Sequence, residues 1–403
     1  MLTAAFILAA TSWGAVPAPA PHNDFPIALV GGFSSWGRDE LLGAKYWGGL
    51  GRDIQEDLKL QGHETVTPAV APFSSNWDRA CELYAILKGG CVDYGKAHSE
   101  RFGHGRYGRT YPGLLKHWGE TDASGHLAKV HLVAHSQGGQ TSRMVTQLLA
   151  EGDAKEREAT PAGELSPLFQ GGHAWVKSVS TLSTPHNGST LAWMENPIIG
   201  PGQQFMEYIA SLVSTQYFIY DLKLDQWGIQ QKKGESLSSY LTRLANSPLG
   251  SSHDFGPWDL GPEGAAEINT WVHAQSQVYY FSWSTEKTWT DIFGHAHPRL
   301  TMVLPLWSGA EYMGHVSKGT GPMRVDSTWF PNDGVVNTSS MAGPSKDPIQ
   351  AYDGHPKSGL WNHMGTLDGW DHFDVIGWGL QHGGDVLPLY RELADSLSQL
   401  DDK

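Results

Sequence analysis

The chain has 403 residues, with 42 acidic and 28 basic side chains and a formal net charge of −14 at neutral pH. A chain of this length can bury a large core, as one big α/β domain or as two ordinary ones. The net acidic charge argues against nucleic acid as a partner. Two cysteines are too few for a disulfide scaffold.

The N-terminal segment predicts a secretory leader over residues 1–20. A short apolar run, residues 1–10, is followed by small residues and an Ala/Pro-rich stretch. This run is too short to span a bilayer, although it lacks the early Lys or Arg of many leaders. No other segment is long and apolar enough to cross a membrane. The expectation is therefore a soluble protein that is secreted to the extracellular space.

Five segments after the leader predict strands. They cover residues 25–30, 130–134, 176–183 and 278–284, with 64–67 as a weaker strand. Helical patterns alternate with these segments, which favours an α/β fold with a mostly parallel sheet and helices on both faces. Nothing resembling a linker divides the chain. Residues 21–403 are therefore expected to form one domain, with insertions at about 73–110 and 190–260.

The third predicted strand leads directly into a candidate nucleophile, Ser136. Small residues flank this serine two positions away on each side, Ala134 and Gly138, and a helix-forming run follows. This is the strand, nucleophile elbow and helix of an α/β-hydrolase, in which the serine hydroxyl projects above the sheet edge. The N–H of Gln137 can then face a developing oxyanion. The alternative is an ordinary surface serine in a Gly-rich turn, because such short strings also occur by chance.

A serine nucleophile needs a base and an orienting acid, which follow it in this fold in the order acid, then His. Asp333 lies in a tight turn between apolar runs, although such an aspartate can also simply cap its own backbone. Several histidines lie downstream, and spacing does not choose among them: His355, His363, His372 and His382. Among these, His372 lies in a loop before an apolar run, where the triad histidine is expected.

A second oxyanion donor is predicted after the first strand. The strand ends in Gly31 and Gly32, and the N–H of the next residue, Phe33, can face the same oxyanion as that of Gln137. A Gly-rich turn is also ordinary strand-end geometry, so this motif is weak when taken alone.

A possible metal site involves Asp78, His98 and His104, which have the ligand types that zinc prefers. The spacing of the two histidines is not distinctive, and exposed loop histidines are the alternative.

The stretch 203–213 has apolar residues at helical spacing. Core packing is the default explanation for such a helix. Within an insertion of a secreted hydrolase, it can instead form a lid over the active site.

Over most of its length the chain resembles the thermoalkalophilic, zinc-containing bacterial lipases, which are related to the staphylococcal lipases. The similarity extends from about residue 26 to about residue 400. It is carried by the blocks 37–41, 45–49, 74–82, 108–113, 134–140, 220–228 and 332–334. Matches this long and this dispersed are specific to the family.

The resemblance implies an α/β-hydrolase fold with a helical lid and hydrolysis of triacylglycerol through an acyl-enzyme. It assigns Ser136 as the nucleophile, His372 as the base and Asp333 as its acid, with oxyanion donors at Phe33 and Gln137. A carboxylesterase, a phospholipase or a polyester depolymerase would use the same machinery. A non-catalytic lipid-binding protein on this fold would usually have lost a triad member, and all three are present.

The resemblance also implies two metal sites. Its zinc ligands correspond to Asp78, His98, His104 and Asp225, a closed set that suits a structural ion. Its calcium site is weakened or missing here, because the glutamate after the histidine becomes the shorter Asp374. The later acid of that site corresponds to positions 379–380, which offer no carboxylate.

Overall fold

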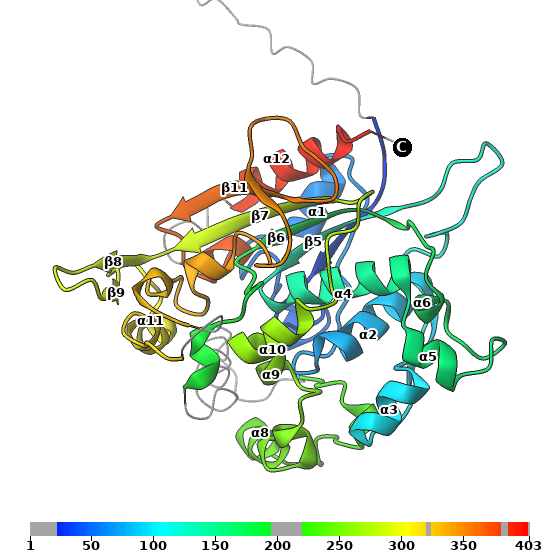
Figure 1. Ribbon diagram of the computed structural model, residues 1–403, viewed down its shortest axis with the longest axis horizontal. Coiled ribbons are helices and arrows are strands. Elements are labelled where there is room, and N and C mark those ends of the chain that lie inside the picture. The colour runs from blue at the N-terminus through cyan, green and yellow to red at the C-terminus, as the bar shows by residue number, and fades with distance from the viewer. Residues whose placement is uncertain (1–21, 195–219, 320–323, 380–385, 402–403) are drawn as a thin grey trace, which may run out of the picture.

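The computed structural model describes residues 22–194, 220–319, 324–379 and 386–401. A seven-stranded sheet in the order β10-β11-β7-β6-β5-β1-β2 crosses the molecule (Figure 1). Every neighbouring pair in it is parallel. Its strands are β1 (Ile27–Val30), β2 (Thr65–Val66), β5 (Val130–His135), β6 (Val176–Leu182), β7 (Tyr279–Glu286), β10 (Ile349–Ala351) and β11 (Trp361–Asp368). The predicted α/β-hydrolase architecture is confirmed, and the five predicted strands are all present.

Side chains on successive strand residues point to opposite faces of this sheet, and each face is covered by helices. Leu29 and Val133 belong to one hydrophobic cluster, whereas their neighbours Ala28 and Leu132 belong to the other. In Figure 1 the first face is covered by α1 (Ile54–Leu60) and α12 (Val386–Ser398). The second is covered by α2 (Asn76–Lys88), α4 (Gln137–Glu151) and α6 (Pro167–Gln170). The central strands are thus buried on both faces: β1 is apolar throughout, whereas β6 also buries Ser178, Ser180 and Thr181.

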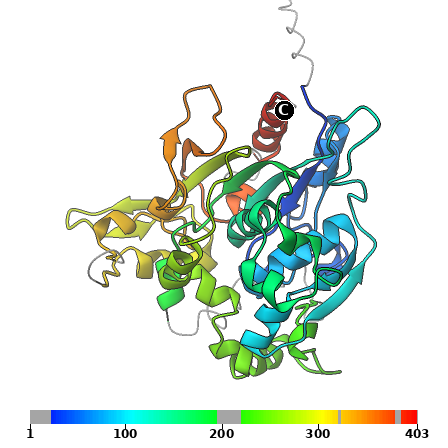
Figure 2. The same ribbon diagram turned by 45° about the vertical axis from the view of Figure 1, so that its right-hand side comes forward.

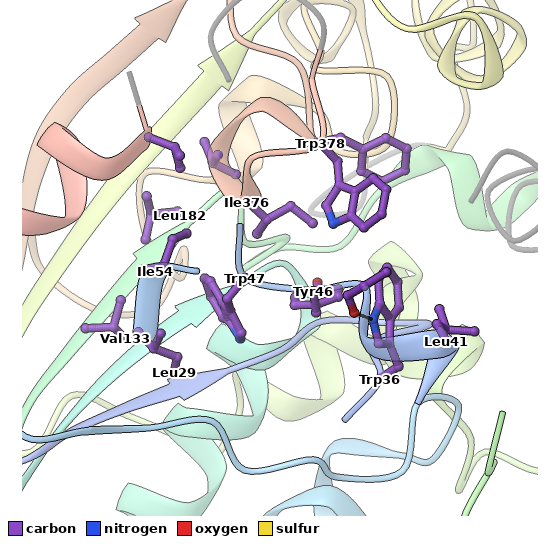
Figure 3. Close-up of a cluster of buried hydrophobic side chains, with 14 of the residues drawn as sticks. Leu29, Trp36, Leu41, Tyr46, Trp47, Ile54, Val133, Leu182, Ile376 and Trp378 are labelled. Atoms are coloured by element: carbon purple, nitrogen blue, oxygen red, sulfur yellow. Dashed lines mark hydrogen bonds between the residues drawn. The ribbon is translucent and has the colours of Figure 1, made fainter. Parts of the chain in front are cut away.

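Aromatic side chains fill the first face near the carboxyl ends of the central strands (Figure 3). Trp36 packs edge-on against Tyr46 and Trp378, with ring centroids 5.1 and 5.8 Å apart. Tyr46 packs in turn against Trp47 at 5.5 Å. These contacts fix the loop after β1 beside the carboxyl end of the sheet.

The remaining elements lie around this core. Two small antiparallel sheets are formed by β3 (Gly90–Asp93) with β4 (Tyr107–Tyr111) and by the hairpin of β8 (Thr288–Thr290) and β9 (Ala296–Pro298). The other helices are α3 (Lys96–Phe102), α5 (Ala154–Ala159), α8 (Leu237–Ala245), α9 (Gly256–Leu260), α10 (Pro262–Ile268) and α11 (Trp307–Met313). Within the described ranges, no helix combines the length and apolar character that crossing a membrane requires. The predicted leader, 1–20, and the predicted lid helix, 203–213, lie outside the described residues.

Candidate active site and metal cluster

The turn between β5 and α4 holds Ser136 in a strained conformation. Its φ of 57° and ψ of −133° are unusual for a residue with a side chain. Two glycines permit the close packing around it. A Cβ on Gly138 would lie 2.2 Å from the carbonyl oxygen of Val30, and one on Gly32 would lie 2.6 Å from Ser136 Cβ. The predicted strand, serine and helix therefore form a nucleophile elbow, and the loop after β1 lies directly against the serine.

Asp333 and His372 form a buried pair, with Asp333 Oδ2 and His372 Nδ1 2.8 Å apart. The same Oδ2 accepts a hydrogen bond from Thr285 Oγ1 at 2.7 Å. The other oxygen, Oδ1, accepts from the N–H groups of Val335 and Val336 at 3.0 and 2.8 Å. Asp333 therefore caps its own turn with Oδ1 and orients the imidazole of His372 with Oδ2.

The other downstream histidines occupy different places. His363 lies in β11 with its Nδ1 3.2 Å from Ser282 Oγ, and His355 lies in an exposed loop. His382 is outside the described residues. His372 and Ser136 line one pocket, together with Phe33. Most of its other lining is apolar, including Leu191, Leu260, Leu306, Val335, Val336 and Phe373.

A buried hydrogen-bond chain connects the loop after β1 to the His372 loop. His135 Nε2 lies 3.0 Å from the carbonyl oxygen of His372, and His135 Nδ1 lies 2.7 Å from Tyr46 Oη. Because a carbonyl only accepts, Nε2 carries the proton and Nδ1 accepts from the tyrosine. Tyr46 Oη in turn accepts from the N–H of Gly32 at 3.0 Å. Burial and the nearby His372 lower the pKa of His135 well below its usual value, so this imidazole stays neutral.

The two predicted oxyanion donors belong to the loop after β1 and to the start of α4. Phe33 follows Gly32, the glycine packed against Ser136. Gln137 opens α4, and an N–H in the first turn of a helix has no intrahelical partner. The buried Arg79 fixes the loop from behind, donating to the carbonyl oxygens of Gly31 at 2.5 Å and Ala71 at 2.7 Å. Two N–H groups are thus available beside the serine for a negatively charged oxygen.

A second cluster joins Asp78, His98, His104 and Asp254. His98 Nε2 lies 3.4 Å from Asp78 Oδ1 and 3.2 Å from Asp254 Oδ1, and His104 Nε2 lies 3.1 Å from Asp254 Oδ2. Ligands of a tetrahedral zinc ion are separated by about 3.3 Å, given metal–ligand bonds of roughly 2 Å. Among the described residues, four buried atoms here that can bind a metal ion lack a hydrogen bond: Asp78 Oδ1, His98 Nε2, His104 Nε2 and Asp254 Oδ2. The donor set fits zinc.

The prediction of Asp225 as the fourth ligand is wrong, and the fourth member of the cluster is Asp254. Asp225 begins a short 3₁₀ helix, Asp225–Trp227, and its carboxylate pairs with Arg109 and accepts from Gln230 Nε2 at 2.9 Å. Its neighbour Gln226 is the residue that reaches the cluster, donating to Asp78 Oδ2 at 2.8 Å. The neighbouring segment thus supports Asp78 from outside the ligand set.

The doubtful calcium ligand, Asp374, binds an ammonium group. Lys287 Nζ lies 2.7 Å from Asp374 Oδ2 and 3.0 Å from Asp371 Oδ2, and all three side chains are fully buried. Asp371 directly precedes His372. A lysine cation thus lies between two carboxylates that flank the histidine. Asp374 is the residue that the family resemblance aligns with a calcium ligand.

Comparison with known proteins agrees with this geometry. A family model described as "Lipase-like, C-terminal domain" matches residues 23–402. The chain belongs to this lipase family. It is 36% identical to a lipase of Staphylococcus epidermidis over 362 residues, which cover 88% of the chain and 50% of that protein. It is 37% identical to a lipase of Staphylococcus hyicus over 89% of the chain and 54% of that protein. The chain thus spans about half the length of these curated relatives, and its predicted resemblance to the staphylococcal lipases is confirmed.

Solved structures give the same result for this lipase-family chain. Lipase 1 from Pelosinus fermentans superposes with a TM-score of 0.86 at 46% identity, covering 94% of this chain and 99% of the other. EstA from Clostridium botulinum also gives 0.86, at 45% identity and coverages of 94% and 88%. The Staphylococcus hyicus lipase gives 0.78 at 34% identity, covering 95% and 98%.

Proposed function

We propose that this chain is a secreted lipase that hydrolyses carboxylic esters of triacylglycerols through Ser136, His372 and Asp333. The observation that carries the proposal is the pocket in which the strained Ser136 and the Asp333-paired His372 meet an apolar lining. An apolar pocket suits an acyl chain, and the polar residues at its base suit attack on the ester.

In the proposed reaction, Ser136 Oγ attacks the ester carbonyl carbon while His372 takes its proton. Asp333 holds the imidazole in the tautomer that presents Nε2 and stabilises the imidazolium. The N–H groups of Phe33 and Gln137 bind the oxyanion, and each such donor is typically worth about 3 kcal/mol in the transition state. The protonated His372 then passes its proton to the departing alcohol. Water, deprotonated by the same histidine, hydrolyses the acyl-enzyme.

Substrate preference separates a lipase from a carboxylesterase, a phospholipase or a polyester depolymerase with the same triad. We expect p-nitrophenyl esters of medium and long acyl chains to be hydrolysed, together with emulsified triolein. The apolar lining stabilises longer chains by about 0.8 kcal/mol for each buried CH₂ group. Rates measured from two to sixteen carbons, beside triolein, a phospholipid and a polyester film, test this. Activity confined to two- to four-carbon esters, with none on triolein, would indicate a carboxylesterase.

The cluster of Asp78, His98, His104 and Asp254 would hold a structural zinc ion. Two carboxylates and two imidazoles fill a tetrahedral shell, so the ion supplies folding energy and no reactive water. It would connect α2, α3 and the following loop to the segment before α9. Hydrogen bonds to two of these ligands support this role. Ser75 Oγ donates to Asp254 Oδ1 at 2.5 Å, and His104 Nδ1 lies 2.9 Å from the carbonyl oxygen of Gly105.

Replacing Asp254 by Asn should release the zinc, whereas Asp225→Asn should retain it. An amide is a much weaker zinc ligand than a carboxylate, whereas the Asp225 carboxylate pairs with Arg109 and accepts from Gln230. Elemental analysis after dialysis against a chelator should find about one zinc per chain in the wild type and in Asp225→Asn. Asp254→Asn should lose at least tenfold in zinc affinity. Its melting temperature should fall more than its initial rate measured at low temperature. Zinc loss in the Asp225 variant alone would restore the assignment from the sequence.

Two further features rest on the sequence. The leader at 1–20 would direct secretion, and the helical pattern at 203–213 would form a lid that opens at a lipid surface. The described residues on both sides of that segment support the location of a lid. Leu191 and Ala192, shortly before it, line the pocket. Tyr220, the first described residue after it, packs against Phe73.

A further inference from the structure

A group of histidines and carboxylates lies outside both of these sites, where the β8–β9 hairpin meets α11. His297 lies in β9, Glu311 lies in α11, and His315 follows two residues after that helix ends. Figures 1 and 2 both show this hairpin projecting at one end of the molecule beside α11. The contact is close because a Cβ on Gly314 would lie only 1.8 Å from the carbonyl oxygen of Ala296.

Each of the three residues directs one metal-binding atom toward the other two, and these atoms lie within 4.8 Å of one another. His297 Nδ1 is 3.0 Å from Glu311 Oε2, and His315 Nε2 is 3.8 Å from Glu311 Oε1. These separations are close to those between the ligands of a zinc ion, about 3.3 Å in a regular tetrahedron.

The tautomers of both imidazoles favour a metal ion. His315 Nδ1 lies 2.8 Å from the carbonyl oxygen of Glu311, which can only accept, so Nδ1 carries the proton and Nε2 keeps its lone pair. His297 Nε2 lies 3.3 Å from Asp291 Oδ2, so Nδ1, which lies 3.0 Å from Glu311 Oε2, is the atom that can face a metal ion. A metal-bound histidine typically donates its second N–H to a carboxylate or a carbonyl, and both histidines have such a partner.

Backbone N–H groups of the turn between β8 and β9 hold the carboxylate of Asp291 in place. Asp291 Oδ1 accepts hydrogen bonds of 2.9 Å from the N–H groups of Phe293 and His295, which leaves Oδ2 directed at His297. The ring of His295 stacks on that of His315, with centroids 4.4 Å apart. A third imidazole therefore lies beside the first two.

An ordinary surface ion pair does not account for the convergence of these three side chains. His117 and Glu120 form such a pair, 2.9 Å apart and exposed, and in the described part of the chain no third histidine, cysteine or carboxylate converges on it. At the hairpin, by contrast, two imidazoles and a carboxylate converge, and each imidazole has a hydrogen-bond acceptor behind it. We propose that His297, Glu311 and His315 bind a divalent transition-metal ion such as zinc. The three side chains are 24%, 51% and 37% exposed, so water completes the coordination and the ion exchanges readily.

Such an ion would link the hairpin to α11, which also forms a wall of the active-site pocket. Ser308 and Gly309, in the first turn of α11, line that pocket with Ser136. A metal ion that fixes Glu311, in the same helix, to His297 would therefore stiffen this wall. This site is distinct from the buried cluster at Asp78, which is built from other elements.

Calorimetric titration with zinc chloride tests the site. The protein is first dialysed against a mild chelator that leaves the buried zinc in place. We expect the wild type to bind one further zinc ion per chain, and His315→Ala to lose at least tenfold in affinity for it. Glu311→Gln provides a second variant in case the first folds poorly. His117→Ala is the matched control and should bind like the wild type.

Asp254→Asn separates the two sites, because it removes a buried ligand and leaves the hairpin unchanged. This variant should still take up the exchangeable ion. Equal zinc binding by the wild type, His315→Ala and Glu311→Gln would overturn the proposal. So would a wild type that binds no further ion, or an equal loss of binding in His117→Ala.

Discussion

Replacing Ser136 by Ala should lower kcat on p-nitrophenyl esters by about 10⁴-fold or more, because the nucleophile and its proton transfer act as one unit. The protein should remain folded. The variant removes one oxygen from a residue that is held mainly by its backbone, between β5 and α4. Steady-state rates and circular dichroism measure the two effects. A phosphonate ester inhibitor should label the wild type at this serine alone.

Ser142→Ala is the matched control, since Ser142 lies in α4 and is equally buried. Within the described structure its hydroxyl has no hydrogen-bond partner, so its removal should change neither the rate nor the melting temperature appreciably. Phosphonate labelling at another residue, or substantial activity in Ser136→Ala, would reject the assigned nucleophile.

The central strands were predictable because β1 is wholly apolar and β5, β6 and β7 are rich in apolar, β-branched and aromatic residues. The edge was not. The run 361–368 in β11 is only partly buried and mixes polar with apolar residues, and β10 has three residues with two exposed. Neither gives the alternating or continuous pattern from which strands are recognised.

Local motifs predicted the elbow, but the contacts that position it connect residues far apart in the sequence. Tyr46 and His135 are 89 residues apart, and neither has a spacing that announces their hydrogen bond. The only available signal was their presence in blocks shared with the lipase family. Asp254 was missed for a related reason. Asp225 and Asp254 are both aspartates within the insertion 190–260, and only the fold shows that Arg109 neutralises the first.

The ion pairs of Lys287 likewise join residues that are far apart in the sequence. Removing the charge of Lys287 is the second large effect that we expect. Lys287→Met should destabilise the protein by about 3–5 kcal/mol, because it leaves Asp371 and Asp374 buried without their cation. Since Asp371 precedes His372, the loop should shift and kcat should fall by about 10²-fold. Lys96→Met is the control, because Lys96 forms an exposed pair with Glu100 that contributes little.

The loss of stability in Lys287→Met should also depend on pH. Burial and the adjacent Asp374 raise the pKa of Asp371 to about 6 even with the lysine present, and its removal raises this pKa further. A carboxyl group whose folded pKa exceeds its unfolded value is favourable to folding at low pH, and this contribution is lost as pH rises through the folded pKa. Urea unfolding should therefore show a larger deficit for the variant at pH 8 than at pH 5. In the wild type, where the ammonium lies between the carboxylates, submillimolar calcium should leave the melting temperature nearly unchanged. A deficit independent of pH, or a large shift at micromolar calcium, would contradict this role for Lys287.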